Sequence, residues 1–286
     1  MRKVPETVKR TVAIIAIALA SAALVLAMVY FFAFPAMTIV SDPAFNQVLP
    51  KAELRRLGLS LAAQGIRLKV ETLQSNSLGD AEAFVSAISK AKGSWVLLSP
   101  AASAFAVSNG INVCELLPKS LTIAIFTNPD TGLFDCTLVS DEDSGWSMAA
   151  RTIAVEMATT SKNAALVYEK DRDKSLDAIR EAFRTGWLSQ FEDDGESRLF
   201  VSETMTELDR QGIFVVLCPY ESRLSDFFRS PGTVSWVVDY RFAPAVPKDQ
   251  LYGIVKPNLK EALQIAMGCE KGSIYYVNME YAYGQL

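Results

Sequence analysis

Hydrogen-bonding and aromatic side chains gather in one short stretch near the N-terminus, MTIVSDPAFNQ at residues 37–47. Ser41 and Asp42 follow a β-branched run there, and Phe45 and Asn46 come at the start of a helical pattern. Hydroxyl, carboxylate and amide groups bind polar ligands through hydrogen bonds, while an aromatic ring can stack on a base or a sugar. The stretch therefore predicts recognition of a small polar ligand.

The sequence of 286 residues contains no histidine. Histidine is the commonest general base and the commonest metal ligand, so a Ser-His-Asp or Cys-His site is excluded and zinc catalysis is disfavoured. The phosphate-binding patterns G-x-x-x-x-G-K-[ST] and G-x-G-x-x-G are also missing. The net charge of −4 does not suggest the concentrated basic surface of a nucleic-acid-binding protein. We expect a protein that is not an enzyme and that uses no cofactor, no metal and no nucleic acid.

Apolar runs and amphipathic stretches alternate along the rest of the chain, which predicts strands and helices in turn. The expected strands are 37–41, 67–73, 94–98, 120–126, 134–140, 163–168, 198–203, 213–218, 233–239, 251–256 and 273–282. The expected helices are 44–64, 79–92, 101–107, 144–159, 173–190, 204–211, 221–229 and 258–268. This order is typical of an α/β fold with parallel strands and right-handed crossovers. The number of strands favours two sheets side by side, each forming a doubly wound lobe.

Ligands of doubly wound sheets bind outside the carboxyl ends of the strands. The residues expected to contact a ligand there are Ser41, Asp42, Phe45, Asn46, Ser99, Asn128, Asp141, Trp146, Tyr220 and Asp239. Each also has a structural alternative. Asp42 and Asp141 could simply cap the helices that follow them, the first with Pro43 as its first residue, and Phe45 could belong to the core.

No residue from Val12 to Phe34 is charged. A helix of this length spans about 30 Å, the thickness of the bilayer core. Residues 1–11 carry four basic residues and one acidic residue, so they should stay in the cytoplasm while the rest is exported. We expect a signal anchor at 12–34 in the cytoplasmic membrane and a periplasmic domain behind it. A cleaved signal peptide is the alternative, although such peptides have a shorter apolar core and end at a small-x-small site.

The four cysteines are Cys114, Cys136, Cys218 and Cys269, widely spaced and without a C-x-x-C pair. In an exported domain they could form one or two disulfides. Alternatively, they could be buried thiols that act as small hydrophobic side chains. The spacing favours the second interpretation.

Four segments, taken in order, resemble the type I periplasmic-binding-protein superfamily. They are TIVSDPAFNQ, TLVSDEDSGWSMAARTIAVEM, AALVYEKDRDKSLDAIREAFRTGW and WVVDYRFAPAVPKDQLYGIVKPNLKEALQIAMG. Their order and spacing carry the resemblance, which covers essentially all of 37–286. The resemblance implies an N-terminal lobe of 37–140 plus 256–270 and a C-terminal lobe of 141–255 plus 271–286. It also implies that the lobes close over a ligand.

Within that superfamily the chain resembles most the basic membrane lipoproteins that bind nucleosides. Asp42-Pro43-Ala44-Phe45-Asn46 partly matches their Asp-x-Ser-Phe-Asn turn, and Gly253-Ile254-Val255-Lys256 partly matches their Ser-Val-x-Lys strand. This resemblance implies that Phe45 stacks on a base, that Asp42, Asn46 and Asp239 bind base or sugar, and that Lys256 also contacts the ligand. The lipobox cysteine of these proteins is absent.

These observations predict a membrane-anchored solute-binding protein that takes up a nucleoside or a sugar with an ABC permease. A sensor or protein-interaction domain on the same fold, with a degenerate cleft, is the alternative.

Overall fold

The computed structural model describes residues 14–25, 28, 34–49, 51–127, 132–160, 162–169, 176–193, 195–203, 212–220, 229 and 232–284. The expected helix at 204–211 and nearly all of the one at 221–229 lie outside these residues, as does Asn128. Residues 14–25 are helical. Within the described ranges, no helix combines the length and the hydropathy needed to cross a bilayer. The expected anchor at 12–34 lies partly outside those ranges.

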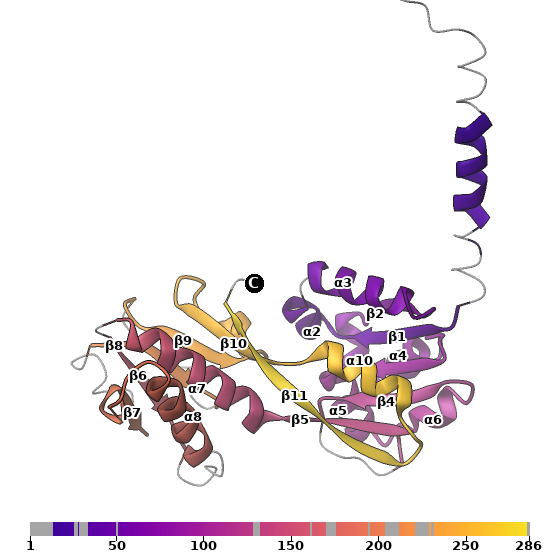
Figure 1. Cartoon of the computed structure of the whole chain (residues 1–286). Coiled ribbons are helices and arrows are strands. Elements are labelled where there is room, and N and C mark those ends of the chain that lie inside the picture. The colour runs from indigo at the N-terminus through magenta and orange to yellow at the C-terminus, as the bar shows by residue number, and fades with distance from the viewer. Residues whose placement is uncertain are drawn as a thin grey trace, which may run out of the picture.

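The described strands form one 11-stranded sheet in the order β2-β1-β3-β4-β5-β11-β10-β9-β8-β6-β7 (Figure 1). The strands are β1 (Ala36–Ser41), β2 (Arg67–Thr72), β3 (Trp95–Leu98), β4 (Leu121–Ile125), β5 (Cys136–Asp141), β6 (Asn163–Val167), β7 (Leu199–Ser202), β8 (Ile213–Cys218), β9 (Ser235–Asp239), β10 (Leu251–Pro257) and β11 (Ser273–Tyr283). All pairs are parallel except that of β10 with β11. Each strand that the sequence predicted is present within a few residues.

Strand β11 joins what the sequence predicted to be two separate sheets. Its residues 273–278 pair with β5, and its residues 279–283 pair with β10. The strand is long enough to bond two neighbours in succession, so the sheet is continuous. We call β2-β1-β3-β4-β5 the first half of the sheet and β10-β9-β8-β6-β7 the second half.

The helices are α2 (Pro43–Val48), α3 (Lys51–Ala62), α4 (Ala81–Ile88), α5 (Pro100–Ser108), α6 (Val113–Leu116), α7 (Glu142–Ala158), α8 (Leu176–Leu188) and α10 (Leu259–Gly268). Short 3₁₀ turns lie at Ser75–Leu78, Glu196–Arg198 and Ala243–Ala245. The single helix expected at 44–64 is two helices, because Leu49 has an extended backbone (φ −101°, ψ 95°). Leu49 precedes Pro50 in the sequence, and a residue before proline disfavours helical dihedrals. The short helix α6 was not predicted.

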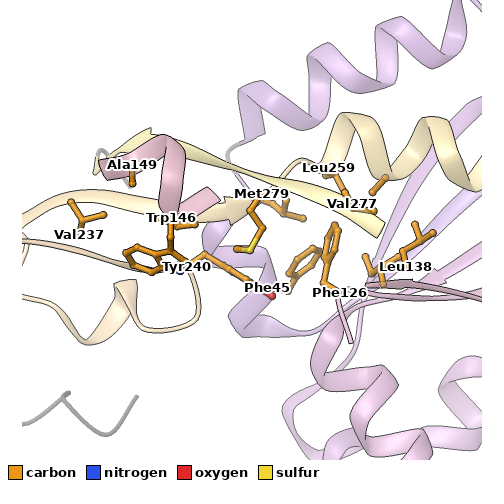
Figure 2. Packing of buried hydrophobic residues seen from close by; sticks show 14 of the residues in the cluster. Phe45, Phe126, Leu138, Trp146, Ala149, Val237, Tyr240, Leu259, Val277 and Met279 are labelled. Atoms are coloured by element: carbon orange, nitrogen blue, oxygen red, sulfur yellow. The ribbon is translucent and has the colours of Figure 1, made fainter. Parts of the chain in front are cut away.

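Alternate side chains of β1 point into different cores, as the two-residue period of a strand requires. Met37 and Ile39 belong to a large cluster that continues across both halves and includes side chains of α3, α7, α8 and α10. Val40 belongs to a cluster with side chains of α4, α5 and α6 on the other face of the first half. A third cluster covers the corresponding face of the second half. The large cluster is therefore common to both halves (Figure 2).

Helix α7 lies directly against β10 and β11 because Gly145 has no side chain. A β-carbon at this position would lie 2.5 Å from Cβ of Met279 and 2.6 Å from Cγ1 of Val255. Asp141 caps the helix by accepting a hydrogen bond from the Ser144 amide at 3.4 Å. The Asp-x-x-x-Gly pattern thus starts α7 at the point where the chain leaves the first half and enters the second.

Candidate functional site

A pocket of about 230 Å³ lies at the carboxyl ends of β4, β5 and β9. Both halves of the sheet contribute to it. Its lining residues are Pro100, Ala104, Phe126, Thr127, Val139, Ser140, Glu142, Asp239, Tyr240, Arg241 and Met279. The pocket is therefore located where the strand-end rule places ligands in α/β proteins.

Three charged residues form one side of the pocket. Arg241 holds the buried carboxylate of Asp239 with two parallel bonds, Nε to Oδ1 at 2.7 Å and Nη2 to Oδ2 at 3.1 Å. Nη2 also lies 3.3 Å from Oε1 of Glu142, which comes from the start of α7. The side chain of Asp239 is almost fully buried, whereas that of Arg241 is 50% exposed. The arrangement fixes the guanidinium and leaves part of it open to a ligand.

The same contacts determine the charge states of the pocket. Burial alone would lower the pKa of Arg241, but the hydrogen bond and the charge of Asp239 raise this pKa overall, so Arg241 stays protonated. Partial burial raises the pKa of Glu142; Arg241 opposes this effect and Asp239 adds to it. Burial, together with the charge of Asp239, raises the pKa of the Tyr240 phenol, which stays neutral. The pocket thus offers a fixed cation beside carboxylate and hydroxyl acceptors.

Aromatic rings form another part of the wall. Phe126 follows β4 and has a left-handed backbone (φ 56°), which is unfavourable for a residue other than glycine. Its amide donates to the Leu138 carbonyl at 2.6 Å. Phe45 lies behind the wall, with its ring centroid 6.1 Å from that of Phe126 and 6.3 Å from that of Tyr240 (Figure 2). Because Phe45 is only 4% exposed, it supports the two pocket rings from the core.

Of the predicted ligand contacts that the structure describes, only Asp239 lines the pocket. Asp42 is 2% exposed and uses both carboxylate oxygens within the protein. Oδ1 accepts from the amides of Ala44 and Phe45, each at 2.9 Å, and Oδ2 accepts from the Ser99 hydroxyl at 2.7 Å. Asp42 and Ser99, both predicted ligand contacts, therefore bind each other, and Asp42 caps α2.

The Ser41 hydroxyl donates to Oδ1 of Asn46 at 2.7 Å, and Nδ2 of Asn46 donates to the Thr72 hydroxyl at 2.7 Å. This network ties α2 to the ends of β1 and β2. Asn46 is half-buried, and neither Ser41 nor Asn46 is among the residues that line the pocket.

The remaining predicted residues are dispersed. Trp146 is buried in the large core cluster, and Asp141 caps α7 beside the pocket residues Ser140 and Glu142. Lys256 is nearly buried and pairs with Glu53 at 2.6 Å and with Glu280 at 3.3 Å. Tyr220 is half-buried just after β8, and the residues that follow it lie outside the described ranges. These placements fit structural roles for Trp146 and Lys256.

Sequence reasoning missed Phe126, Glu142 and Arg241. All three lie within two residues of the end of a strand, and Arg241 follows the predicted Asp239 by only two positions. A window that included two residues after each strand, and that asked for a cation to balance Asp239, would have found Arg241.

No protein-family model matches the chain, and no curated protein does. Among solved structures that resemble it is one described as a mutant of the XylFII-LytSN complex. That chain is 13% identical, with 88% of this chain and 98% of that chain covered and a TM-score of 0.50. A carbohydrate-transporter solute-binding protein from Agrobacterium radiobacter in complex with D-arabinose is 18% identical, with coverages of 88% and 95% and a TM-score of 0.38. A periplasmic ribose ABC transporter protein from Conexibacter woesei is 12% identical, with coverages of 88% and 93% and a TM-score of 0.41.

The first of these similarities extends over almost the whole of both chains. It confirms the type I periplasmic-binding-protein fold that the sequence predicted.

Proposed function

We propose that the chain is an extracytoplasmic solute-binding protein that closes two lobes over a small polar ligand. The pocket formed by both halves of the sheet, with Arg241 fixed by Asp239 at its edge, is the observation that carries this proposal. A ligand that contacts both halves favours the closed arrangement by its difference in affinity for the two states. The lobes are 37–140 with 256–270, and 141–255 with 271–286.

Closure of such lobes requires hinges in the connecting segments. The chain passes between the halves where β5 is followed by α7, where β10 is followed by α10, and along β11. Glu142 is the first residue of α7, and Met279 is the first residue of β11 that pairs with β10. Because these two pocket residues lie at hinge positions, ligand contact and lobe movement are directly coupled.

A nucleoside or a sugar fits the chemistry of the pocket. The Arg241 guanidinium offers donors, the Glu142 carboxylate offers acceptors, and the hydroxyls of Thr127 and Ser140 offer both. Phe126 adds an apolar surface for a ring. A ligand rich in hydroxyl groups satisfies these groups better than an apolar one, which would leave them unpaired.

The uncharged run at 12–34 supports anchoring in the cytoplasmic membrane with the lobes in the periplasm. There the protein would pass its ligand to an ABC-type permease. Membrane attachment keeps the binding domain close to such a partner and limits its diffusion to two dimensions.

The test is a ligand screen of the full chain in lipid nanodiscs, with nucleosides, sugars and amino acids, followed by calorimetry. A ligand at about 100 times its Kd stabilises the fold by about 2.7 kcal/mol. Arg241→Gln should weaken that ligand by about 10- to 100-fold, as expected for the loss of a charged hydrogen bond. Arg184→Gln is the matched control, because Arg184 pairs with Glu181 on the exposed surface of α8. Equal affinity in both variants would contradict the proposed site.

A sensor or protein-interaction domain is the second candidate. It is favoured by one observation: the similar structure with a TM-score of 0.50 was solved as a complex of two named components. Under this alternative the Arg241–Asp239 pair serves the fold, and the pocket stays empty. Two results together would support this alternative. No ligand in the screen stabilises the protein, and a partner protein co-purifies equally with the natural chain and with the Arg241→Gln variant.

A further inference from the structure

A second hollow, which we call the basal groove, lies at the opposite ends of the strands from the pocket. It has a volume of about 460 Å³ and is lined by residues 91–93, which precede β3, and by residues 116–120, which precede β4. Leu116, Leu117 and Pro118 make much of its wall apolar. The groove therefore has a largely apolar wall and lies at the amino ends of the first-half strands.

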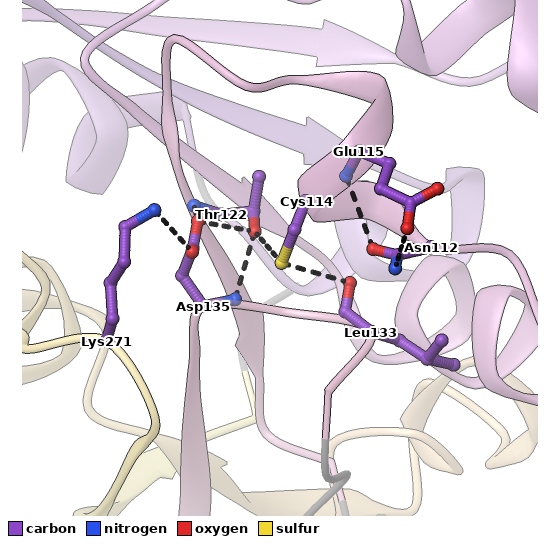
Figure 3. Close-up of polar contacts among 7 residues, drawn as sticks. All are labelled: Asn112, Cys114, Glu115, Thr122, Leu133, Asp135 and Lys271. Carbon is purple, nitrogen blue, oxygen red and sulfur yellow. Dashed lines mark hydrogen bonds and ion pairs between the residues drawn. The ribbon is translucent and has the colours of Figure 1, made fainter.

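Two lysines belong to the wall of the basal groove. Lys92 and Lys119 are both exposed, and neither forms an ion pair with any residue that the structure describes. The nearest exposed carboxylate along the chain, Glu115, accepts a hydrogen bond from Nδ2 of Asn112 at 2.9 Å (Figure 3). Two cations thus remain available beside an apolar surface, in a chain whose net charge is −4.

Lys271, another lysine at this edge of the sheet, is neutralised by an ion pair. Lys271 lies 2.9 Å from Oδ1 of Asp135, and the amide and hydroxyl of Thr122 donate to Oδ2 at 2.9 and 3.0 Å (Figure 3). Asp135 is buried and serves the fold. Lys92 and Lys119, unlike Lys271, form no ion pair with a described residue. Their charges therefore do not serve the fold through an internal ion pair.

Hydrogen bonds join the segment at residues 92–94, beside the basal groove, to β1, the first strand after the N-terminal segment. The Thr38 hydroxyl donates to the Lys92 carbonyl at 2.7 Å, and the Ser94 amide donates to the Ala36 carbonyl at 2.7 Å. Arg67 adds a further cation here, with Nε donating to the Phe34 carbonyl at 3.2 Å. The groove and the start of β1 therefore form one edge of the domain.

We propose that the basal groove docks on an anionic phospholipid surface. Lys92 and Lys119 would bind the lipid phosphates. The apolar wall would contact the boundary between the lipid headgroups and the acyl chains. The proposal rests on the membrane anchor of the proposed function, because a segment that leaves the bilayer at about residue 34 brings this edge to the membrane. Each basic residue held at an anionic surface strengthens association by about fivefold. Docking by this edge leaves the pocket, at the other ends of the strands, facing away from the lipid.

The test compares the full chain in nanodiscs of phosphatidylcholine alone with nanodiscs that also contain phosphatidylglycerol. Amide hydrogen exchange is measured over 90–95 and 113–121, with 176–188 of α8 as an internal reference. We expect slower exchange of the two groove segments in the anionic discs. Lys92→Gln with Lys119→Gln, or added salt, should remove the difference, while the exposed pair Lys248→Gln with Lys260→Gln should preserve it.

Equal exchange in the two discs, with the chain inserted in both, overturns the inference and leaves the groove to a protein partner. Protection that survives in the double lysine variant also overturns it. If carbonate extraction shows that the chain does not stay in the bilayer, the anchor of the proposed function is wrong. Sedimentation with phosphatidylglycerol vesicles then decides the docking separately: binding that depends on Lys92 and Lys119 supports it, and its absence refutes it.

Discussion

The hydroxyl of Ser99 donates to the carboxylate of Asp42 at 2.7 Å, although 57 residues separate them in the sequence. The Asp42 amide in turn lies 3.2 Å from the Ser99 oxygen, so a second hydrogen bond joins the same pair. Both had been predicted to bind a ligand. In the fold they join the ends of β1 and β3 just before α2 and α5 begin.

Asp42→Ala should destabilise the domain by about 2–3 kcal/mol, because it removes a helix cap and leaves a buried hydroxyl without its acceptor. Chemical denaturation measures this loss. Asp80→Ala is the matched control, since Asp80 caps α4 through one hydrogen bond at an exposed site. The control should cost about 1 kcal/mol or less. A stable Asp42→Ala variant with lost ligand affinity would instead return Asp42 to the binding site.

Phe45→Ala should cost about 3–5 kcal/mol of folding free energy, because a buried ring is replaced by a cavity beneath Phe126 and Tyr240. Phe45→Leu should cost less, because it preserves most of the apolar contact. Thermal unfolding ranks the two variants. Ligand affinity should fall in Phe45→Ala through disorder of the pocket wall, and Phe45→Leu should recover much of it. Direct stacking on a ligand predicts the opposite: full stability and no recovery by leucine.

Gly145→Ala should destabilise the domain by about 1–3 kcal/mol through overpacking against Met279 and Val255. Gly58→Ala, in α3, is the control. A β-carbon at Gly58 would meet nothing within 4 Å, so this change should stabilise the helix by up to about 1 kcal/mol. Denaturation of the two variants should therefore give shifts of opposite sign. Equal shifts would show that α7 does not approach β10 and β11 as closely as described.

Asp135 makes stability depend on pH. Burial alone would raise the pKa of its carboxyl, but donation from Thr122 and the nearby Lys271 lower this pKa overall. An unfolded aspartate has a pKa of about 3.9, so the contribution of Asp135 is present above that value and is lost as the pH falls through the lower folded-state pKa. Asp135→Asn should cost about 1.5–3 kcal/mol at neutral pH and flatten the acid limb of the stability curve.

The control for Asp135→Asn is Asp249→Asn, at an exposed carboxylate. Urea unfolding between acid and neutral pH measures how the free energy of unfolding changes with pH. In the control this slope should equal that of the natural protein. An unchanged slope in Asp135→Asn as well would contradict the ionic role of this residue.

Cys136 and Cys269 should form a disulfide under oxidising conditions. Their sulfur atoms lie 2.8 Å apart, although both thiols are free in the structure. Oxidation by a disulfide donor removes both thiol hydrogens, joins the sulfurs and reduces the donor to thiols. Closing a loop of roughly 100 residues or more stabilises a fold by about 4–5 kcal/mol in the chain-entropy description.

Mass mapping after non-reducing digestion detects this link, and Cys136→Ser abolishes it. Cys114 and Cys218 should remain alkylatable after unfolding and serve as internal references. Complete alkylation of all four cysteines without reductant would favour the other interpretation, in which they are buried thiols.

Local pattern was sufficient to predict the strands and most helices of this protein. A run such as MTIVS alternates between two cores, and a fully apolar run such as WVLL must be buried, so each predicts its strand without knowledge of its neighbours. The caps at Asp42, Asp141 and Asp80 are local as well, because an N-cap bonds amides only two or three residues ahead. The order of these elements also indicated the fold.

Only the tertiary structure decided which of these residues meet. Strand β11 makes one sheet of two halves because its edge bonds to β5 and then to β10, which are far apart in the chain. Asp42 turns to Ser99 and Phe45 turns to the core because those partners come from other strands. Arg241 and Glu142 meet beside Asp239 because α7 lies against the second half, where Gly145 permits close approach. Residue types at strand ends determine what chemistry is available, but packing between distant elements selects the side chains that face the pocket.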